Sequence, residues 1–206
     1  MTTRRYERAK RGLDLVIAVS VTVLTSPVMA AVAAAIKLDD GGRIFFRQER
    51  IGRYGRPFEI VKFRTLADAP AHDPADYLIS ATDPRITRVG AFLRRWSLDE
   101  LPQVWNVLCG EMSIVGPRPT LRYQVDQYDE FQRRRLEALP GVTGWAQVRG
   151  RNDLSWPERI ELDVWYVDHR SLPLDVAILG STFKILFRRS SVYNDAQGDW
   201  GEREQS

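Results

Sequence analysis

The chain has 206 residues, a formal net charge of +3, two histidines and one cysteine. Its length is typical of one domain with a full hydrophobic core. One cysteine excludes an internal disulfide framework and fits a reducing compartment, and the lack of CxxC or HxxxH spacing argues against a zinc site. The small net charge gives no reason to expect nucleic acid as a partner.

An uncharged apolar segment, residues 15–36, lies between two basic stretches. As a straight helix it would be about 33 Å long, close to the hydrocarbon thickness of a bilayer. Three interpretations compete: a spanning helix, a cleaved signal peptide, and a re-entrant segment that enters and leaves the membrane by the same face. The signal peptide is the least favoured, because the apolar run is long for one.

Ser26 and Pro27 interrupt this segment. Proline removes a backbone donor and its ring clashes with the carbonyl four residues earlier, whereas the serine hydroxyl can bond to a freed carbonyl. The pair therefore predicts a break in the helix. Basic residues on both sides favour both ends on the cytoplasmic side, but proline also occurs in spanning helices. The residues alone leave re-entry and spanning equally supported.

The next segments alternate between short elements and turns. Residues 43–66 are typical of two short strands around a glycine-rich basic turn, and residues 67–84 of a surface loop. Residues 87–110 predict two short helices, with Gly110 as the stop. SIVGPRP predicts an extended turn, and residues 121–139 a charged surface helix.

The last third predicts a glycine-rich loop over residues 140–152 and an amphipathic helix over 156–170. Residues 172–189 combine a broad apolar face with basic residues near the end. This segment is too short to span a bilayer comfortably, so it is either a core helix or a helix that lies at the membrane interface.

Asp99 and Glu100 are adjacent in WSLDELPQ, residues 96–103, between the two helices expected there. One interpretation is structural: Ser97 and Glu100 have capping-box spacing, and acids in a first helical turn complement the helix dipole. The other is that the pair carries chemistry. The local pattern alone favours the structural interpretation.

Four blocks decide between them: KRGLDLVIAVSVTVLTSPV, EIVKFRTL, ITRVGAFLRRWSLDELPQVWNVLCGEMSIVGPRP and GVTGWAQVRGRN. They closely resemble the monotopic phosphoglycosyl transferases, in order from about residue 8 to residue 189. The resemblance implies transfer of a sugar phosphate from a UDP-sugar to polyprenyl phosphate, with release of UMP, as the first membrane step of glycoconjugate assembly such as exopolysaccharide. It also implies a re-entrant helix broken at Ser26 and Pro27, and an Asp-Glu dyad at Asp99 and Glu100 that works with Mg²⁺.

By this resemblance Asp99 is the nucleophile and metal ligand, and forms a covalent phosphosugar intermediate, whereas Glu100 serves as base or proton relay. Arg94 and Arg118 are expected to bind phosphate, since the guanidinium fork suits it. The remaining residues that match family blocks are expected at the substrate, without assignment to nucleotide, sugar or fold: Lys62, Arg64, Arg151 and Asn152.

The expected fold class is α+β: a small membrane-associated domain with an N-terminal re-entrant helix-break-helix, a short β-hairpin and amphipathic interfacial helices. We expect a basic N-terminus with the membrane helix over residues 1–40, a cytosolic catalytic domain over 41–189 and a flexible polar tail over 190–206. The expected location is the bacterial cytoplasmic (inner) membrane, with the catalytic domain on its cytoplasmic face and membrane lipid as a partner. The sequence names neither the UDP-sugar nor the oligomeric state, and a homodimer stays open.

Two rival functions stay open as well. A membrane-anchored, non-catalytic adaptor with a basic lipid-binding face explains the charge, but it does not explain why the acid pair and the GPRP arginine occur together. A glycosyltransferase or a lipid phosphatase is the enzymatic rival. Release of UMP from a UDP-sugar distinguishes the phosphoglycosyl transferase from all of them.

Overall fold

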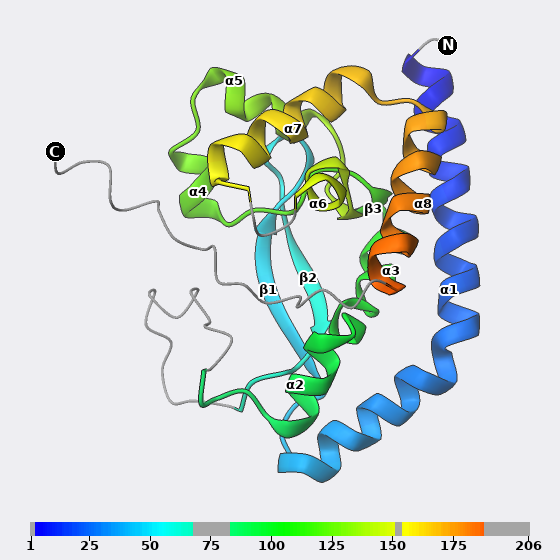
Figure 1. The fold of residues 1–206 in the computed structure, drawn as a ribbon, viewed down its shortest axis with the longest axis vertical. Helices are drawn as coiled ribbons and strands as arrows, with labels where there is room; N and C mark the ends of the chain where they lie inside the picture. Colours follow the sequence, from blue (N-terminus) through cyan, green and yellow to red (C-terminus); the bar gives the residue numbers. More distant parts are fainter. Residues whose placement is uncertain (1–2, 68–82, 151–153, 188–206) are drawn as a thin grey trace, which may run out of the picture.

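The computed structural model describes residues 3–67, 83–150 and 154–187. Three predicted features lie wholly or mostly outside these ranges: the loop expected over 67–84, Arg151 and Asn152, which were expected at the substrate, and the tail over 190–206. The described part confirms an α+β fold that combines one long N-terminal apolar helix, a small β-hairpin and several short helices (Figure 1).

Helix α1 (Thr3–Asp40) carries the apolar segment and contains Pro27. The break predicted there is a bend within one continuous helix, and Figure 1 shows α1 changing direction between its dark-blue and lighter-blue halves. Side-chain hydroxyls take up carbonyls just before the proline: Ser26 Oγ donates to the Val23 carbonyl at 2.9 Å, and Thr25 Oγ1 to the Val21 carbonyl at 2.7 Å. Proline and these hydroxyl bonds together account for a bend here.

One side of α1 packs on the rest of the chain, and another is left bare. Its first half contacts α3, β3 and α8, and its second half contacts α2. Ala18 and Ile36 are buried in these contacts. By contrast, a series of valine and leucine side chains is exposed, namely Val16, Val19, Val23, Leu24 and Val28.

Strands β1 (Phe45–Ile51) and β2 (Pro57–Phe63) form the predicted antiparallel hairpin, with Phe45 opposite Phe63 and Ile51 opposite Pro57. The basic turn between them is a short 3₁₀ turn, η1 (Arg53–Gly55). Gly55 has φ +75°, a conformation that glycine adopts without strain. The hairpin therefore has a turn end near Arg53 and an open end near Lys62.

The predicted helix pair after the hairpin is confirmed as α2 (Arg88–Arg95) and α3 (Gln103–Cys109), separated by the 3₁₀ turn η3 (Leu98–Glu100). Gly110 ends α3 at φ +85°, as expected for a helix stop. Asn106 ties α3 to β2, because its side chain donates to the Glu59 carbonyl at 2.6 Å and accepts from the Val61 amide at 3.1 Å. The hydrogen bonds of Asn106 thus hold α3 against β2, and η3 joins α3 to α2.

A parallel strand pair was not predicted. β3 (Ser113–Val115) lies in SIVGPRP, and β4 (Gly141–Thr143) lies in the segment expected to be only a glycine-rich loop. The backbones approach so closely here that a Cβ on Gly141 would lie 2.1 Å from the Gly116 nitrogen. Strands of three residues are too short to show a period of two, so the pattern could not reveal them.

The single charged helix expected over residues 121–139 is wrong. The structure has α4 (Arg122–Asp126), α5 (Glu130–Arg133) and the 3₁₀ turn η4 (Arg134–Glu137) instead. Asp129 starts a new helix within the segment: its carboxylate accepts from the Gln132 amide at 2.8 Å, while the Gln132 side chain accepts from the Asp129 amide at 3.2 Å. This capping box interrupts the helical run.

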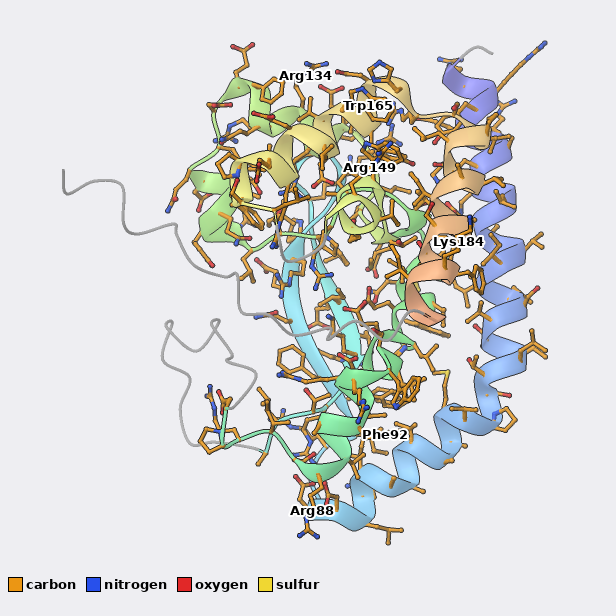
Figure 2. All side chains as sticks on the ribbon, in the orientation of Figure 1. Arg88, Phe92, Arg134, Arg149, Trp165 and Lys184 are labelled. Carbon is orange, nitrogen blue, oxygen red and sulfur yellow. The ribbon has the colours of Figure 1, made fainter. Side chains whose placement is uncertain are left out.

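Helices α6 (Trp145–Arg149), α7 (Trp156–His169) and α8 (Leu172–Phe187) complete the described fold. An aromatic stack joins α6 to α7: the Arg149 guanidinium lies 4.1 Å from the Trp145 ring centre, and Trp145 stacks on Trp165 at 5.1 Å (Figure 2). α8 runs beside α1 (Figure 1) and buries Asp175 and Ile178 while leaving Val176 and Phe183 exposed. It therefore has both a core face and a bare apolar face.

Candidate active site

The acid pair lies in η3, a single 3₁₀ turn between α2 and α3. Ser97 precedes it in the left-handed region, at φ +54° and ψ +24°, and its side chain makes no capping hydrogen bond. The capping-box interpretation is therefore wrong: α3 begins only at Gln103, and the acids do not occupy its first turn. A serine at positive φ is unusual. This strained residue lies where the chain leaves α2 and enters the turn that carries the acids.

Glu100 is engaged by two cations from other parts of the chain. The Lys62 Nζ atom, on β2, lies 2.8 Å from Glu100 Oε1, and a guanidinium nitrogen of Arg118 lies 3.8 Å from the same oxygen. Burial would raise the pKa of Glu100, but the charges of Lys62 and Arg118 outweigh it and lower that pKa to about 2. Glu100 is therefore a carboxylate at neutral pH.

Asp99 forms no ion pair and no side-chain hydrogen bond with any residue in the described ranges. Burial, and after it the charge of the adjacent Glu100 carboxylate, raise the pKa of its carboxyl to about 6, against the opposing charges of Lys62 and Arg94. The two neighbours therefore differ: one acid is held in place by cations, while the other is left available.

Arg94 reaches the site from α2, and its Nε donates to Thr65 Oγ1 at 2.9 Å. Gly90, one turn earlier on α2, makes this approach possible, because a Cβ there would lie 2.1 Å from the Thr65 carbonyl oxygen. The helix thus packs directly on the backbone that follows β2. This contact places Arg94 close enough to Asp99 for its charge to act on that pKa.

Arg64 makes structural contacts with neighbouring segments and is not exposed in the site. Its side chain is buried, pairs with Asp40 at the end of α1, and donates through Nε to the Arg43 carbonyl at 2.5 Å. These contacts fasten the open end of the hairpin to α1. A role for Arg64 in substrate binding stays a prediction, whereas its structural contacts are plain.

Sequence reasoning missed the residues that hold the site from behind. Arg135 donates to the backbone carbonyl of Arg118 at 3.0 Å and pairs with the buried Asp163, and both side chains are about 2% exposed. Gln103, buried beside the dyad, contributes a hydrogen bond that helps to lower the pKa of Glu100. Gln103 stands in SLDELPQ and could have been noticed there, but no local pattern links Arg135 to Arg118.

The structure brings together Asp99, Glu100, Lys62, Arg94 and Arg118, and it does not describe Arg151 or Asn152. Within the described ranges, no three His, Cys, Asp or Glu side chains converge as a ready-made metal cage. Mg²⁺ does not need one, because it commonly binds one or two carboxylates and completes its shell with water and substrate phosphate. The available Asp99 carboxylate fits that requirement.

A family model described as bacterial sugar transferase matches residues 5–189 of the chain. The chain belongs to the bacterial sugar transferases. This sugar transferase is 45% identical over 175 residues to the uncharacterized sugar transferase EpsL of Bacillus subtilis (strain 168), and the match covers 85% of each chain. All site residues named above lie within the matched range.

Two longer relatives carry names that state a reaction. The undecaprenyl-phosphate galactose phosphotransferase of Salmonella typhimurium is 39% identical to this sugar transferase over 199 residues, covering 89% of this chain and 41% of that one. The UDP-glucose:undecaprenyl-phosphate glucose-1-phosphate transferase of Escherichia coli is 42% identical over 178 residues, covering 82% and 38%. The chain thus spans well under half the length of these two relatives.

The family confirms the resemblance found in the sequence and makes the chain a transferase. α1 contributes a second fact, since by length and hydropathy it is able to cross a membrane and only 11% of its most apolar window is buried. A soluble core helix of that length would be mostly buried. Together these observations indicate that the sugar transferase associates with a membrane.

Proposed function

We propose that this chain transfers a sugar-1-phosphate from a UDP-sugar to polyprenyl phosphate and releases UMP. The names of the relatives support the substrate classes. The observation that carries the proposal is the unequal pairing of the dyad: Lys62 and Arg118 hold Glu100, while Asp99 has no ion-pair partner among the described residues. A carboxylate that is available beside fixed cations suits attack on a phosphate.

In the first step, a carboxylate oxygen of Asp99 attacks the phosphorus nearest the sugar. A bond forms between the carboxylate oxygen and this phosphorus, giving an acyl phosphate. The bond from the phosphorus to the bridging oxygen breaks, and UMP leaves with the electron pair. Phosphoryl transfer depends mainly on positioning and charge neutralisation, so Lys62, Arg94 and Arg118 serve to hold the diphosphate and offset its developing charge. When bound, Mg²⁺ would neutralise phosphate charge next to Asp99.

In the second step, an oxygen of polyprenyl phosphate attacks the phosphosugar, and Asp99 leaves as a carboxylate. In this proposal Glu100 takes the acceptor's proton, as base or proton relay. Its low pKa makes it a weak base while Lys62 and Arg118 surround it, so this role requires that substrate phosphates draw those cations away. One phosphoanhydride is exchanged for another, and the overall free-energy change is therefore small.

We further propose that α1 is re-entrant, with both ends on the cytoplasmic face and the catalytic part facing the cytoplasm. The bend at Ser26 and Pro27, the exposed apolar side chains around it and the basic flanks support this arrangement. Dyad and membrane are then close, because the second half of α1 packs against the residues beside η3. A lipid acceptor can reach Asp99 without leaving the bilayer.

The test is mass spectrometry of the intact protein after incubation with a panel of UDP-sugars and Mg²⁺, without polyprenyl phosphate. We expect a phosphosugar adduct on Asp99 with stoichiometric UMP release, and multiple turnovers only when polyprenyl phosphate is added. Asp99→Asn should lose both, whereas Glu100→Gln should lose turnover but still form some adduct. An adduct on another residue would overturn the assignment of Asp99, and no UMP release with any UDP-sugar would favour the adaptor.

A further inference from the structure

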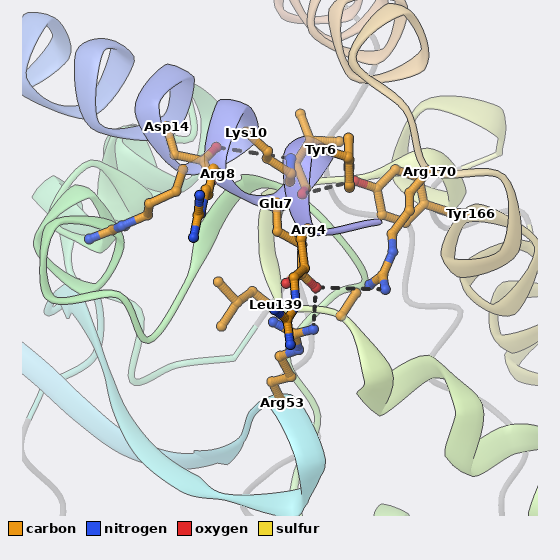
Figure 3. Close-up of a pocket in the computed structure, with 13 residues that line it drawn as sticks. Arg4, Tyr6, Glu7, Arg8, Lys10, Asp14, Arg53, Leu139, Tyr166 and Arg170 are labelled. Atoms are coloured by element: carbon orange, nitrogen blue, oxygen red, sulfur yellow. Dashed lines mark hydrogen bonds and ion pairs between the residues drawn. The ribbon is translucent and has the colours of Figure 1, made fainter. Parts of the chain in front are cut away.

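A second polar site lies at the other end of the hairpin from the dyad. A cavity of about 450 Å³ opens between the first turns of α1, the hairpin turn and the segment after η4 (Figure 3). Strand β2 separates it from the dyad: Arg53 stands at the turn, whereas Lys62 stands near the open end, about 17 Å along the strand from Pro57. The cavity is therefore not part of the site described above.

The cavity wall carries an excess of positive charge. Two acids line it, Glu7 and Asp14. Six basic side chains line it as well, namely Arg4, Arg8, Lys10, Arg11, Arg53 and Arg170. The guanidinium groups exceed what the acids can neutralise, so the cavity attracts anions.

Some of these basic side chains are already paired with acids or backbone carbonyls of the chain. Glu7 lies 2.5 Å from Arg53 and 3.9 Å from Arg170, as the dashed lines in Figure 3 show. Lys10 lies 3.1 Å from Asp175 on α8, and Arg11 donates to the carbonyls at the end of α3. These contacts hold the wall in a fixed shape.

Arg4 and Arg8 are different. Both are exposed, and neither forms an ion pair or a hydrogen bond with another residue in the described ranges. They stand one helical turn apart on α1, and both line the cavity. A guanidinium fork matches the oxygens of a phosphate group.

The position of the cavity indicates where that phosphate comes from. Arg8 precedes the apolar segment at residue 15 by about 10 Å of helix, which is comparable to the depth of the headgroup region of a bilayer. Beyond it, exposed valines such as Val16 and Val19 begin. A group seated in the cavity is thus level with lipid headgroups if α1 enters the membrane at this segment.

We propose that this cavity binds the phosphodiester headgroup of an anionic phospholipid, with Arg4 and Arg8 as the phosphate ligands. Bound lipid fixes the depth and orientation of the first half of α1. The site is distinct from the acceptor site and does not depend on the transfer reaction.

The test uses the full-length protein in detergent and isothermal titration calorimetry with three probes: dihexanoyl phosphatidylglycerol, dihexanoyl phosphatidylcholine and inorganic phosphate. No UDP-sugar is present, so the result is independent of catalysis. Arg8→Gln and Arg4→Gln are compared with Arg5→Gln, which removes the same charge from the same exposed stretch of α1 but does not line the cavity.

We expect the wild type and Arg5→Gln to bind phosphatidylglycerol alike, and Arg8→Gln and Arg4→Gln to bind it at least fivefold more weakly. Phosphatidylcholine, which has the same phosphodiester without net charge, should bind weakly to all of them. Equal binding of phosphatidylglycerol by the Arg8 and Arg5 variants would overturn the proposal. Binding of inorganic phosphate but not of phosphatidylglycerol would show a soluble anion as the ligand and overturn the lipid assignment.

Discussion

Lys62 Nζ lies 2.8 Å from Glu100 Oε1, and this ion pair joins residues 38 positions apart. Lys62 comes from the open end of the hairpin and Glu100 from the turn after α2, so one contact fixes the dyad against the sheet. The contact also makes the two acids different: Glu100 has an ion-pair partner, whereas the neighbouring Asp99 lacks one in the described part of the chain.

Replacing Lys62 with Met should remove this charge while keeping most of the side-chain stem. We expect turnover to fall by roughly 10²-fold, the usual loss when one group that stabilises transition-state charge is removed. The readout is steady-state UMP release. The Arg47→Met variant, which loses an exposed pair with Glu59 on the same hairpin, is the control and should keep its activity. Equal losses in both variants would contradict a specific role for Lys62.

Gly90 allows α2 to lie on the backbone of Thr65. Gly90→Ala would place a methyl group 2.1 Å from a carbonyl oxygen, so we expect α2 to shift and unfolding to become easier by about 1–3 kcal/mol. Urea unfolding in detergent measures this. Gly12→Ala on α1 is the matched control, because nothing outside the neighbouring backbone of its own helix lies within 4 Å of its added Cβ, and it should be neutral or slightly stabilising. A stable Gly90→Ala variant would show that the contact is loose.

The buried pair of Arg135 and Asp163 supports the backbone of Arg118. Asp163→Ala leaves a buried guanidinium without its partner, and the expected loss of unfolding free energy is about 3–5 kcal/mol. Asp168→Ala breaks the exposed pair with Arg134, where the side chains are 42% and 38% exposed, and should cost less than about 1 kcal/mol. Chemical unfolding of the two variants side by side measures both losses. Similar losses of unfolding free energy would contradict a special role for the buried pair.

The topology of α1 is tested by cysteine labelling in intact cells. The exposed Cys109 is first replaced by Ser, and single cysteines are then introduced at Arg5 and Arg47, on either side of the apolar segment. A re-entrant helix predicts that a membrane-impermeant maleimide labels neither site until the cells are lysed. Labelling of one site alone from outside would establish a spanning helix instead.

Local signals in the sequence sufficed for much of the fold. The hairpin, the pair of helices around the dyad and the stop at Gly110 each depend on turn residues or periodicity within a few positions, and all were predicted. The parallel pair β3–β4 was not, because its strands are three residues long and 28 positions apart. The single helix expected over residues 121–139 was wrong because Asp129 begins a new helix there. Its capping box lies inside a run whose pattern is continuously helical.

For the site, sequence reasoning supplied the dyad and the cations that meet there through family motifs rather than geometry. One of the two interpretations placed Ser97 and Glu100 in a helix cap, yet Ser97 adopts a left-handed conformation and Glu100 pairs with Lys62. Arg135 and Asp163 were missed because their importance comes from burial and from a partner 28 positions away. Such pairing is a property of the packed chain and leaves no local mark.

The second half of α1 packs through Val32 and Ile36 against a cluster that includes Leu93, with Leu98 and Leu101 at its edge. Leu98 and Leu101 flank the acid pair, so the second half of α1 packs against the turn that carries the dyad. If α1 settles in a bilayer one helical turn deeper, Asp99 descends by about 5 Å toward the phosphate plane of the lipids. The depth of α1 in the membrane would thereby set how far the Asp99 carboxylate stands from a lipid-borne acceptor.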